Sequence, residues 1–266
     1  MNALEVRSIS LQFGGIVVLN QVSLAVARGE LLALIGPNGA GKTSVFNCIS
    51  GIYRPSGEIL LDGKTILALR PSDIAQRGVA RTFQHAELVA EMSVIDNLLA
   101  ARHSMIGTGI FSEMLNLPGA RRIETAHRQV VAEILDLVDM GSLRDRTVAD
   151  LPFGTQKILG FARALAMNPQ VLLLDEPSAG LTGEERLEMA HFIRKIRKKL
   201  NLAIIWIEHD MKMVAELADR VVVLDYGRML ATGTANEVLQ DPNVVSAYLG
   251  TGLSLRKTGD DQNAAQ

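Results

Sequence analysis

The sequence predicts an α/β fold with a partly parallel sheet, an antiparallel β subdomain and an inserted helical subdomain. Short runs of apolar residues recur between segments of helical periodicity, which is typical of buried parallel strands joined by crossover helices. Alternating apolar and polar residues near the N-terminus indicate strands with one exposed face. The long middle region has no such apolar runs and shows helical spacing instead.

The N-terminal part is expected to form antiparallel strands. Apolar residues alternate over residues 4–13 and again over residues 22–26, and the dipeptide Gly14-Gly15 lies between the two runs. A further strand is expected at residues 58–61, closed by the turn dipeptide Asp62-Gly63.

Four apolar runs are expected to be buried strands of the parallel sheet. They are residues 31–35, 171–174, 203–207 and 221–224. A glycine-rich turn follows the first run, and a helix is expected from there to about Ile49, with Gly51 as its stop.

Residues 72–149 are expected to form the mostly helical subdomain, without a comparable buried strand. Within them, residues 104–119 contain three glycines and one proline and are interpreted as a loop. Residues 256–266 have almost no apolar content and are expected to be a disordered tail, so the folded domain would span residues 4–250. The helical spacing is carried by Ala126, Val130, Ile134, Leu137 and Val138.

Composition limits the class of protein. The 27 basic and 29 acidic residues give a formal net charge of −2, which is no reason to expect nucleic-acid binding. The mean hydropathy is +0.19, yet even the longest charge-free stretch, residues 8–27, is broken by polar residues and glycines, so no membrane span is expected. Residues 1–7 do not resemble a secretory signal. The single cysteine, Cys48, excludes an internal disulfide framework, and we expect a soluble cytoplasmic chain.

A phosphate-binding motif follows the first apolar run. Residues 36–43 fit the pattern G-x-x-x-x-G-K-[ST] between a strand and a helix. Backbone N–H groups and the helix N-terminus would surround phosphate oxygens, Lys42 would bridge the β- and γ-phosphates of ATP, and Thr43 would ligate Mg²⁺. The motif predicts a P-loop NTPase core; the alternative is a glycine-rich turn without a ligand. The predicted nucleotide-binding residues here are Gly36, Pro37, Asn38, Gly39, Ala40, Gly41, Lys42, Thr43 and Ser44.

Two carboxylates end the run at residues 171–174. Asp175 is a candidate Mg²⁺ ligand, and Glu176 could polarise a water for attack on the γ-phosphorus. An acidic strand end without a catalytic role is the alternative, which the nearby phosphate motif disfavours.

Beyond these two motifs, the chain resembles the ATP-binding subunits of ABC transporters, because five further features occur in that family's order from about residue 4 to residue 250. They are Phe13 at the A-loop position, Arg81-Thr82-Phe83-Gln84 at the Q-loop, Leu151-Pro152-Phe153-Gly154-Thr155-Gln156 at the signature, Ser178-Ala179-Gly180-Leu181 at the D-loop and Glu208-His209-Asp210 at the switch histidine.

The resemblance implies a role for each feature. Phe13 would stack on adenine, Gln84 would contact Mg²⁺ or the attacking water, and His209 would contact the γ-phosphate. Gly154 would face ATP held by another copy, since two subunits of this family sandwich two nucleotides head to tail. The signature departs from the family pattern, because Pro152 replaces its serine. Phe153 and Thr155 replace a glycine and a glutamine, so we expect a functional site that is held less strongly.

The signature variant and several other stretches resemble the branch of importers for branched-chain amino acids. This implies an ATPase at the cytoplasmic face of the inner membrane, a homodimer or a heterodimer with a sister ATPase. Its partners would be permease subunits and, indirectly, a periplasmic binding protein, with no nucleic acid. Urea, other amides or aromatic acids are alternative cargos. The other classes considered are a soluble ABC ATPase acting on DNA or ribosomes and a small-molecule P-loop kinase.

Overall fold

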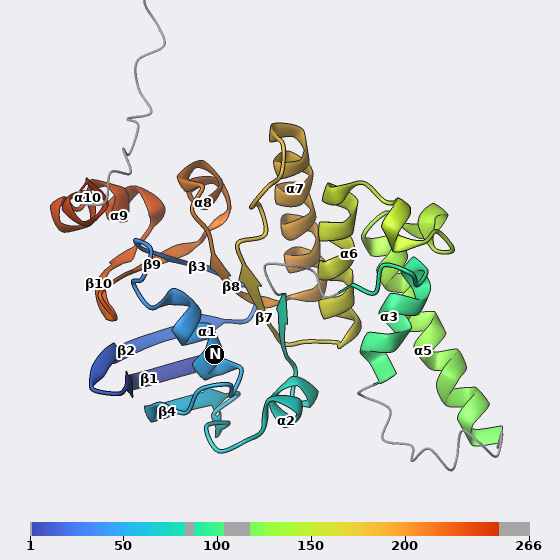
Figure 1. Ribbon diagram of the computed structural model, residues 1–266, viewed down its shortest axis with the longest axis horizontal. Coiled ribbons are helices and arrows are strands. Elements are labelled where there is room, and N and C mark those ends of the chain that lie inside the picture. Colours follow the sequence, from blue (N-terminus) through green and yellow to red (C-terminus); the bar gives the residue numbers. More distant parts are fainter. Residues whose placement is uncertain (1, 83–87, 104–117, 250–266) are drawn as a thin grey trace, which may run out of the picture.

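A six-stranded, mostly parallel sheet forms the centre of the molecule. The computed structural model describes residues 2–82, 88–103 and 118–249 of the chain (Figure 1). The strand order is β10-β9-β3-β8-β7-β6; neighbours from β9 to β6 run parallel, whereas β10 is antiparallel to β9. The expected α/β fold is therefore confirmed. The strands are β3 (Leu31–Ile35), β6 (Val79–Thr82), β7 (Val171–Asp175), β8 (Ala203–Ile207), β9 (Arg220–Asp225) and β10 (Arg228–Gly233).

A smaller antiparallel sheet holds the N-terminal strands in the order β2-β1-β4-β5. The turn between β1 and β2 contains Gly14 and Gly15, with φ of 50° and 89°, and positive φ at both positions suits a tight hairpin. The expected N-terminal hairpin is confirmed. The strands are β1 (Asn2–Phe13), β2 (Ile16–Ala27), β4 (Ser56–Leu61) and β5 (Lys64–Thr65).

One strand falls where none was expected. β6 lies inside residues 72–149, after helix α2 (Pro71–Gln76), and pairs with β7 in parallel. It has only four residues and lies at the sheet edge, and its second half is polar: Arg81 pairs with Asp175, and the Thr82 hydroxyl donates to the Leu173 carbonyl oxygen. Too short to show a periodic pattern, the strand gives no sequence signal, and our expectation of no buried strand in this region was wrong.

The helices after β6 pack together at one end of the central sheet (Figure 1). Arg102 ties three of them, because its Nε donates to His127 Nδ1 at 2.7 Å and its Nη1 donates to the Ala166 carbonyl oxygen at 2.6 Å. The expected loop at residues 104–119 lies outside the described residues except at its end, where a helix begins at Pro118; the expected tail at residues 256–266 lies outside them too. These elements are α3 (Val94–His103), α5 (Pro118–Leu137), η1 (Gly141–Leu143), η2 (Val148–Asp150) and α6 (Phe153–Ala166).

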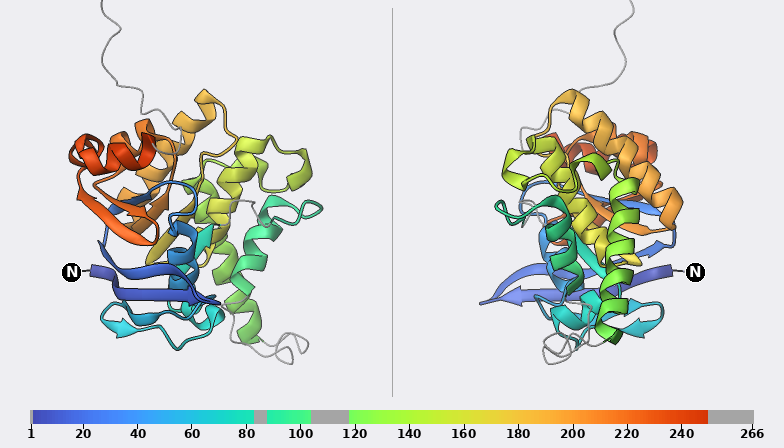
Figure 2. Two further views of the ribbon diagram at one scale, coloured as in Figure 1. Left: turned by 60° about the vertical axis from the view of Figure 1, so that its left-hand side comes forward. Right: turned by 90° about the vertical axis from the view of Figure 1, so that its right-hand side faces the viewer.

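The remaining helices cover the central sheet (Figure 2). They are α1 (Lys42–Ile49), α7 (Gly183–Leu200), α8 (Met211–Leu217), α9 (Ala235–Gln240) and α10 (Pro242–Leu249). Thr182 and Glu185 form a capping box at the start of α7, as its N-terminal sequence suggests. In its second half, Arg194 and Lys195 pair with carboxylates of the chain itself.

Alternate residues of the central strands enter different cores. Leu172 and Leu174 of β7 pack on the side of α6 and α7, whereas Val171 and Leu173 pack with α1 and the antiparallel sheet. Burial on both faces is why β3 and β8 are apolar at every position and β7 at every position before Asp175. Among the described residues, no helix is both long and apolar enough to cross a membrane.

Candidate active site

The phosphate-binding motif forms a tight loop between β3 and α1, which we call the P-loop (residues 36–43). Gly36, Gly39 and Gly41 have φ of 148°, 81° and 100°, values that side-chain-bearing residues rarely adopt. A Cβ on Gly36 would overlap the Leu224 carbonyl oxygen, and one on Gly41 would lie 2.8 Å from a Leu19 methyl group. The glycines therefore allow β2 and β9 to pass close to the loop.

Lys42 lies inside this loop with only 6% of its surface exposed. Its Nζ donates to the carbonyl oxygens of Gly36 at 2.7 Å and Pro37 at 2.9 Å. Burial lowers the pKa of Lys42, and the negative charges of Glu176 and Asp175 act in the opposite direction. The structure thus brings the lysine of the P-loop and the two carboxylates at the end of β7 into one electrostatic site.

Asp175 is held by a buried ion pair that the sequence analysis did not foresee. Arg81 Nη2 lies 2.7 Å from Asp175 Oδ2, and the two side chains are 8% and 11% exposed. Arg81 Nη1 also donates to Asn47 Oδ1 at 2.7 Å, and its guanidinium lies 5.5 Å from the Phe46 ring centroid. Arg81 thus links β6, β7 and α1. Arg81 is the first residue of the predicted Q-loop segment, but nothing in the sequence indicated that its partner is Asp175.

Glu176 and His209 meet at the carboxyl ends of two adjacent parallel strands. His209 Nε2 lies 2.8 Å from Glu176 Oε1, and the Glu176 N–H donates to the Ile207 carbonyl oxygen at 3.0 Å. Glu176 has φ of 48°, a left-handed conformation that is uncommon for residues with side chains and is often found at functional sites. The predicted base and the predicted switch histidine are therefore in direct contact.

The other predicted residues have different positions. Phe13, at the end of β1, is 47% exposed, and its ring packs edge-to-face on Tyr53 with centroids 5.0 Å apart. Thr43 is exposed and Ser44 half-buried in the first turn of α1. Gln84 lies outside the described residues.

Gly154 is not brought to the P-loop of its own chain. It is buried in the first turn of α6, where a Cβ would lie 2.5 Å from Glu185 Oε1. The Thr182 N–H and hydroxyl lower the pKa of Glu185, and the Gly154 N–H adds to this effect. Figure 1 shows α6 and α1 on opposite sides of β7.

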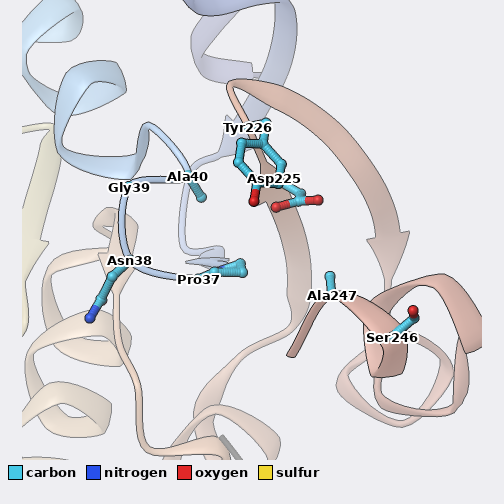
Figure 3. A pocket seen from close by; sticks show the side chains of 8 residues that line it. All are labelled: Pro37, Asn38, Gly39, Ala40, Asp225, Tyr226, Ser246 and Ala247. Atoms are coloured by element: carbon cyan, nitrogen blue, oxygen red, sulfur yellow. The ribbon is translucent and has the colours of Figure 1, made fainter. Parts of the chain in front are cut away.

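A cavity of about 230 Å³ lies beside the P-loop (Figure 3). It is bounded by residues 37–40, by Asp225 and Tyr226 of the turn after β9, and by Ser246 and Ala247 of α10. The next residue of α10, Tyr248, is buried; burial raises its pKa to about 12, and the backbone N–H of Gly36 lowers it by a smaller amount. The C-terminal helix therefore supports the start of the P-loop, a contact that the sequence analysis missed.

Known proteins share the fold and the sequence family of this chain. A family profile described as "ABC transporter" matches residues 19–179, and a profile described as "Branched-chain amino acid ATP-binding cassette transporter" matches residues 228–253. Among solved structures, the ADP conformation of MJ1267, an ATP-binding cassette of an ABC transporter, superimposes with a TM-score of 0.81 at 28% identity and covers 94% of this chain and 99% of that one.

Two curated relatives are similar over nearly their whole length. The chain is 42% identical over 248 residues to the high-affinity branched-chain amino acid transport ATP-binding protein LivG of Escherichia coli strain K12, covering 93% of this chain and 97% of LivG. It is 40% identical, with the same coverage, to BraF of Pseudomonas aeruginosa, which bears the same description.

The P-loop, the two carboxylates at the end of β7 and the histidine after β8 lie within an ABC ATPase fold, and the resemblance to that class is confirmed. The chain belongs to the family of ABC transporter ATP-binding proteins. As an ATPase subunit of such a transporter it binds nucleotide, acts with permease subunits and associates with the membrane peripherally.

Proposed function

We propose that this chain hydrolyses ATP with Glu176 and His209 and thereby powers the import of branched-chain or related amino acids. The observation that carries the catalytic part is the contact of Glu176 with His209 at 2.8 Å. The negative charges of Glu176 and Asp175 also act on Lys42 of the P-loop.

The P-loop is the proposed binding site for the phosphates of ATP. An ammonium group has three protons to donate, and Lys42 directs two of them to loop carbonyl oxygens, so one is left for a phosphate oxygen. The residues from Asn38 to Ser44 supply backbone N–H groups around the start of α1, where the helix dipole favours an anion, whereas Pro37 has no N–H to offer. Phe13 offers an exposed ring face for adenine.

The side chains near the P-loop also fit Mg²⁺. The hydroxyl of Thr43 and the carboxylate of Asp175 are oxygen ligands of the kind that Mg²⁺ combines with phosphates and water. Arg81 accounts for one oxygen of Asp175, and a carboxylate offers about four lone-pair sites. When bound, Mg²⁺ would neutralise charge on the phosphate oxygens. Gln84 is proposed as a further ligand by the family resemblance.

Glu176 is proposed as the group that polarises the attacking water. A carboxylate can accept a proton from a water aligned with the γ-phosphorus. His209 would orient this carboxylate through its Nε2 contact and, once ATP is bound, would donate this single N–H to the γ-phosphate instead. The left-handed backbone at Glu176 is the local strain that often accompanies such a role.

A complete site is proposed to need a second subunit. Gly154 of α6 packs against Glu185 of α7. The signature segment of another copy, or of a sister ATPase, would therefore have to cover the ATP bound to the P-loop of this chain. Pro152 offers no hydroxyl to phosphate, which leaves the backbone N–H groups at the start of α6 as donors.

The cargo is proposed from the relatives. LivG and BraF are named as branched-chain amino acid transport proteins, and the match at residues 228–253 carries the same description. We therefore propose leucine-like amino acids as cargo, a position at the cytoplasmic face of the inner membrane, and a periplasmic binding protein as indirect partner.

Lys42→Ala tests the phosphate site. Nucleotide affinity, measured by titration with a fluorescent ATP analogue, is expected to fall at least tenfold because a charge-assisted hydrogen bond is lost. Lys195→Ala is the matched control, since Lys195 pairs with Asp139 on the surface and its loss should leave affinity unchanged. Equal affinity of Lys42→Ala and the parent would contradict the proposal.

Glu176→Gln tests the catalytic assignment. The variant keeps the shape of the side chain but cannot accept the proton, so steady-state ATPase activity should be lost while ATP binding persists. Hydrolysis at the parental rate would show that Glu176 is not the base.

A further inference from the structure

A buried carboxylate precedes the switch histidine and has no role in the proposal above. Glu208 is 3% exposed. Its Oε1 accepts from the Ser178 hydroxyl at 2.6 Å and from the N–H groups of His209 and Asp210 at 3.1 and 3.3 Å. Its Oε2 accepts from the Trp206 indole N–H at 3.1 Å. Four donors from two segments of the chain therefore converge on one side chain.

These contacts form a closed loop that includes the proposed catalytic pair, Glu176 and His209. Ser178 lies two residues after Glu176, in the segment that leads from β7 to α7. The Ser178 hydroxyl donates to Glu208 at 2.6 Å, and Glu208 also accepts from the backbone N–H of His209. The ring of His209 in turn lies 2.8 Å from the Glu176 carboxylate. A displacement of Ser178 therefore acts on both ends of the contact between Glu176 and His209.

The same segment touches the start of α6. A Cβ on Gly180 would lie 3.2 Å from Phe153 Cε1, and Lys157 Nζ lies 5.5 Å from the centroid of the Phe153 ring. Burial lowers the pKa of Lys157, and the charges of Glu176 and Glu208 oppose this.

We propose that Glu208 is a positioning residue that holds the segment Ser178–Leu181 and His209 as one unit. Contact of a second subunit with the start of α6 would shift this segment, and Glu208 would pass the shift to the pair formed by His209 and Glu176. Coupling of this kind needs a continuous set of packed and hydrogen-bonded groups, and the contacts above form one. The proposal rests on the proposed roles of Glu176 and His209.

Ser178→Ala is the mildest test, because it removes one hydroxyl and leaves the buried carboxylate three donors. The kcat for ATP should fall on the order of tenfold and KM should change less than about twofold, since a hydrogen bond to a charged group is lost away from the nucleotide. Glu208→Met, which has a similar length but no oxygen to accept the Ser178 hydroxyl, should lower kcat at least as much. The double variant should lose about as much as Glu208→Met alone, because the contact between Ser178 and Glu208 is already absent there.

Thr234→Ala is the matched control. Thr234 also donates its hydroxyl to a carboxylate, Glu237 Oε2 at 2.9 Å, but at the start of α9, and its loss should leave kcat unchanged. A parental kcat in Ser178→Ala, or effects of Ser178→Ala and Glu208→Met that multiply in the double variant, would overturn the proposal.

A spectroscopic measurement separates coupling from hydrolysis. Trp206 is the only tryptophan of the chain and donates to Glu208, so its emission reports on the surroundings of this carboxylate. Saturating ATP and Mg²⁺ should change the emission in the parent and in Glu176→Gln, but not in Ser178→Ala. The same change in Ser178→Ala, or no change in the parent, would contradict the coupling. Hydrolysis by Glu176→Gln would instead contradict only the base assignment.

Discussion

Replacing Arg81 by methionine should destabilise the protein through Asp175. The change keeps most of the apolar stem of the side chain but leaves the 11% exposed carboxylate of Asp175 without the cation that now lies 2.7 Å away. Removing one partner of a buried ion pair costs about 3–5 kcal/mol. At about 2–4 °C per kcal/mol for a protein of this size, a loss of about 3 kcal/mol lowers Tm by about 6–12 °C.

The assay is thermal and urea unfolding followed by circular dichroism. The double variant Arg81→Met, Asp175→Asn should regain most of the stability, because the neutral amide leaves no unpaired buried charge. Mg²⁺ with ADP should restore part of it in the single variant, since Asp175 is proposed to ligate the metal. An unfolding free energy of Arg81→Met within about 1 kcal/mol of the parent, or a double variant no more stable than the single one, would refute the reasoning.

Three further predictions concern other parts of the chain. Burial, and then the charge of Arg102, lower the pKa of His127 below 6.5, so the unfolded state binds more protons and stability falls as the pH drops from about 6.5 through the lower, folded-state pKa. Urea unfolding at about pH 7.5 and pH 5.5 should show this loss, and His127→Gln should reduce it; an unchanged loss would contradict the assignment. Burial raises the pKa of Cys48 to about 12, so a thiol reagent should react with it only after unfolding, and rapid labelling of the native protein would contradict this. Gly36→Ala would place a Cβ in the backbone of β9 and should abolish nucleotide binding, whereas Gly183→Ala, which meets open space, should not; equal binding by both variants would contradict the role of the loop.

Features formed by one continuous segment, such as a buried strand or the P-loop, are the ones that the sequence predicts best. The fully apolar runs at residues 31–35 and 203–207 are the buried strands β3 and β8, because burial on both faces requires an apolar residue at every position. The P-loop is recognisable for a similar reason, since its glycines are dictated by close backbone approach. Strand β6 escaped prediction because Arg81 and Thr82 make half of it polar.

Contacts between distant segments could not be predicted in this way. Arg81 and Asp175 are 94 positions apart in the sequence, and Ser178 and Glu208 are 30 positions apart. The residues around each side chain do not indicate which distant residue it contacts. The same holds for Tyr248, whose approach to Gly36 depends on how α10 folds back on the sheet. The motifs predict Glu176 and His209, which the structure brings into contact, whereas the buried partner that holds Asp175 in place could be identified only from the structure.

The central claim is that ATP hydrolysis by Glu176 drives amino-acid import, and uptake by the reconstituted transporter tests it most directly. Proteoliposomes would contain the permease subunits and this chain, with ATP inside and labelled leucine with its binding protein outside. We predict ATP-dependent accumulation of leucine with the parent chain and none above background with Glu176→Gln. Equal accumulation with Glu176→Gln, or no accumulation of leucine by a complex that hydrolyses ATP, would contradict the account.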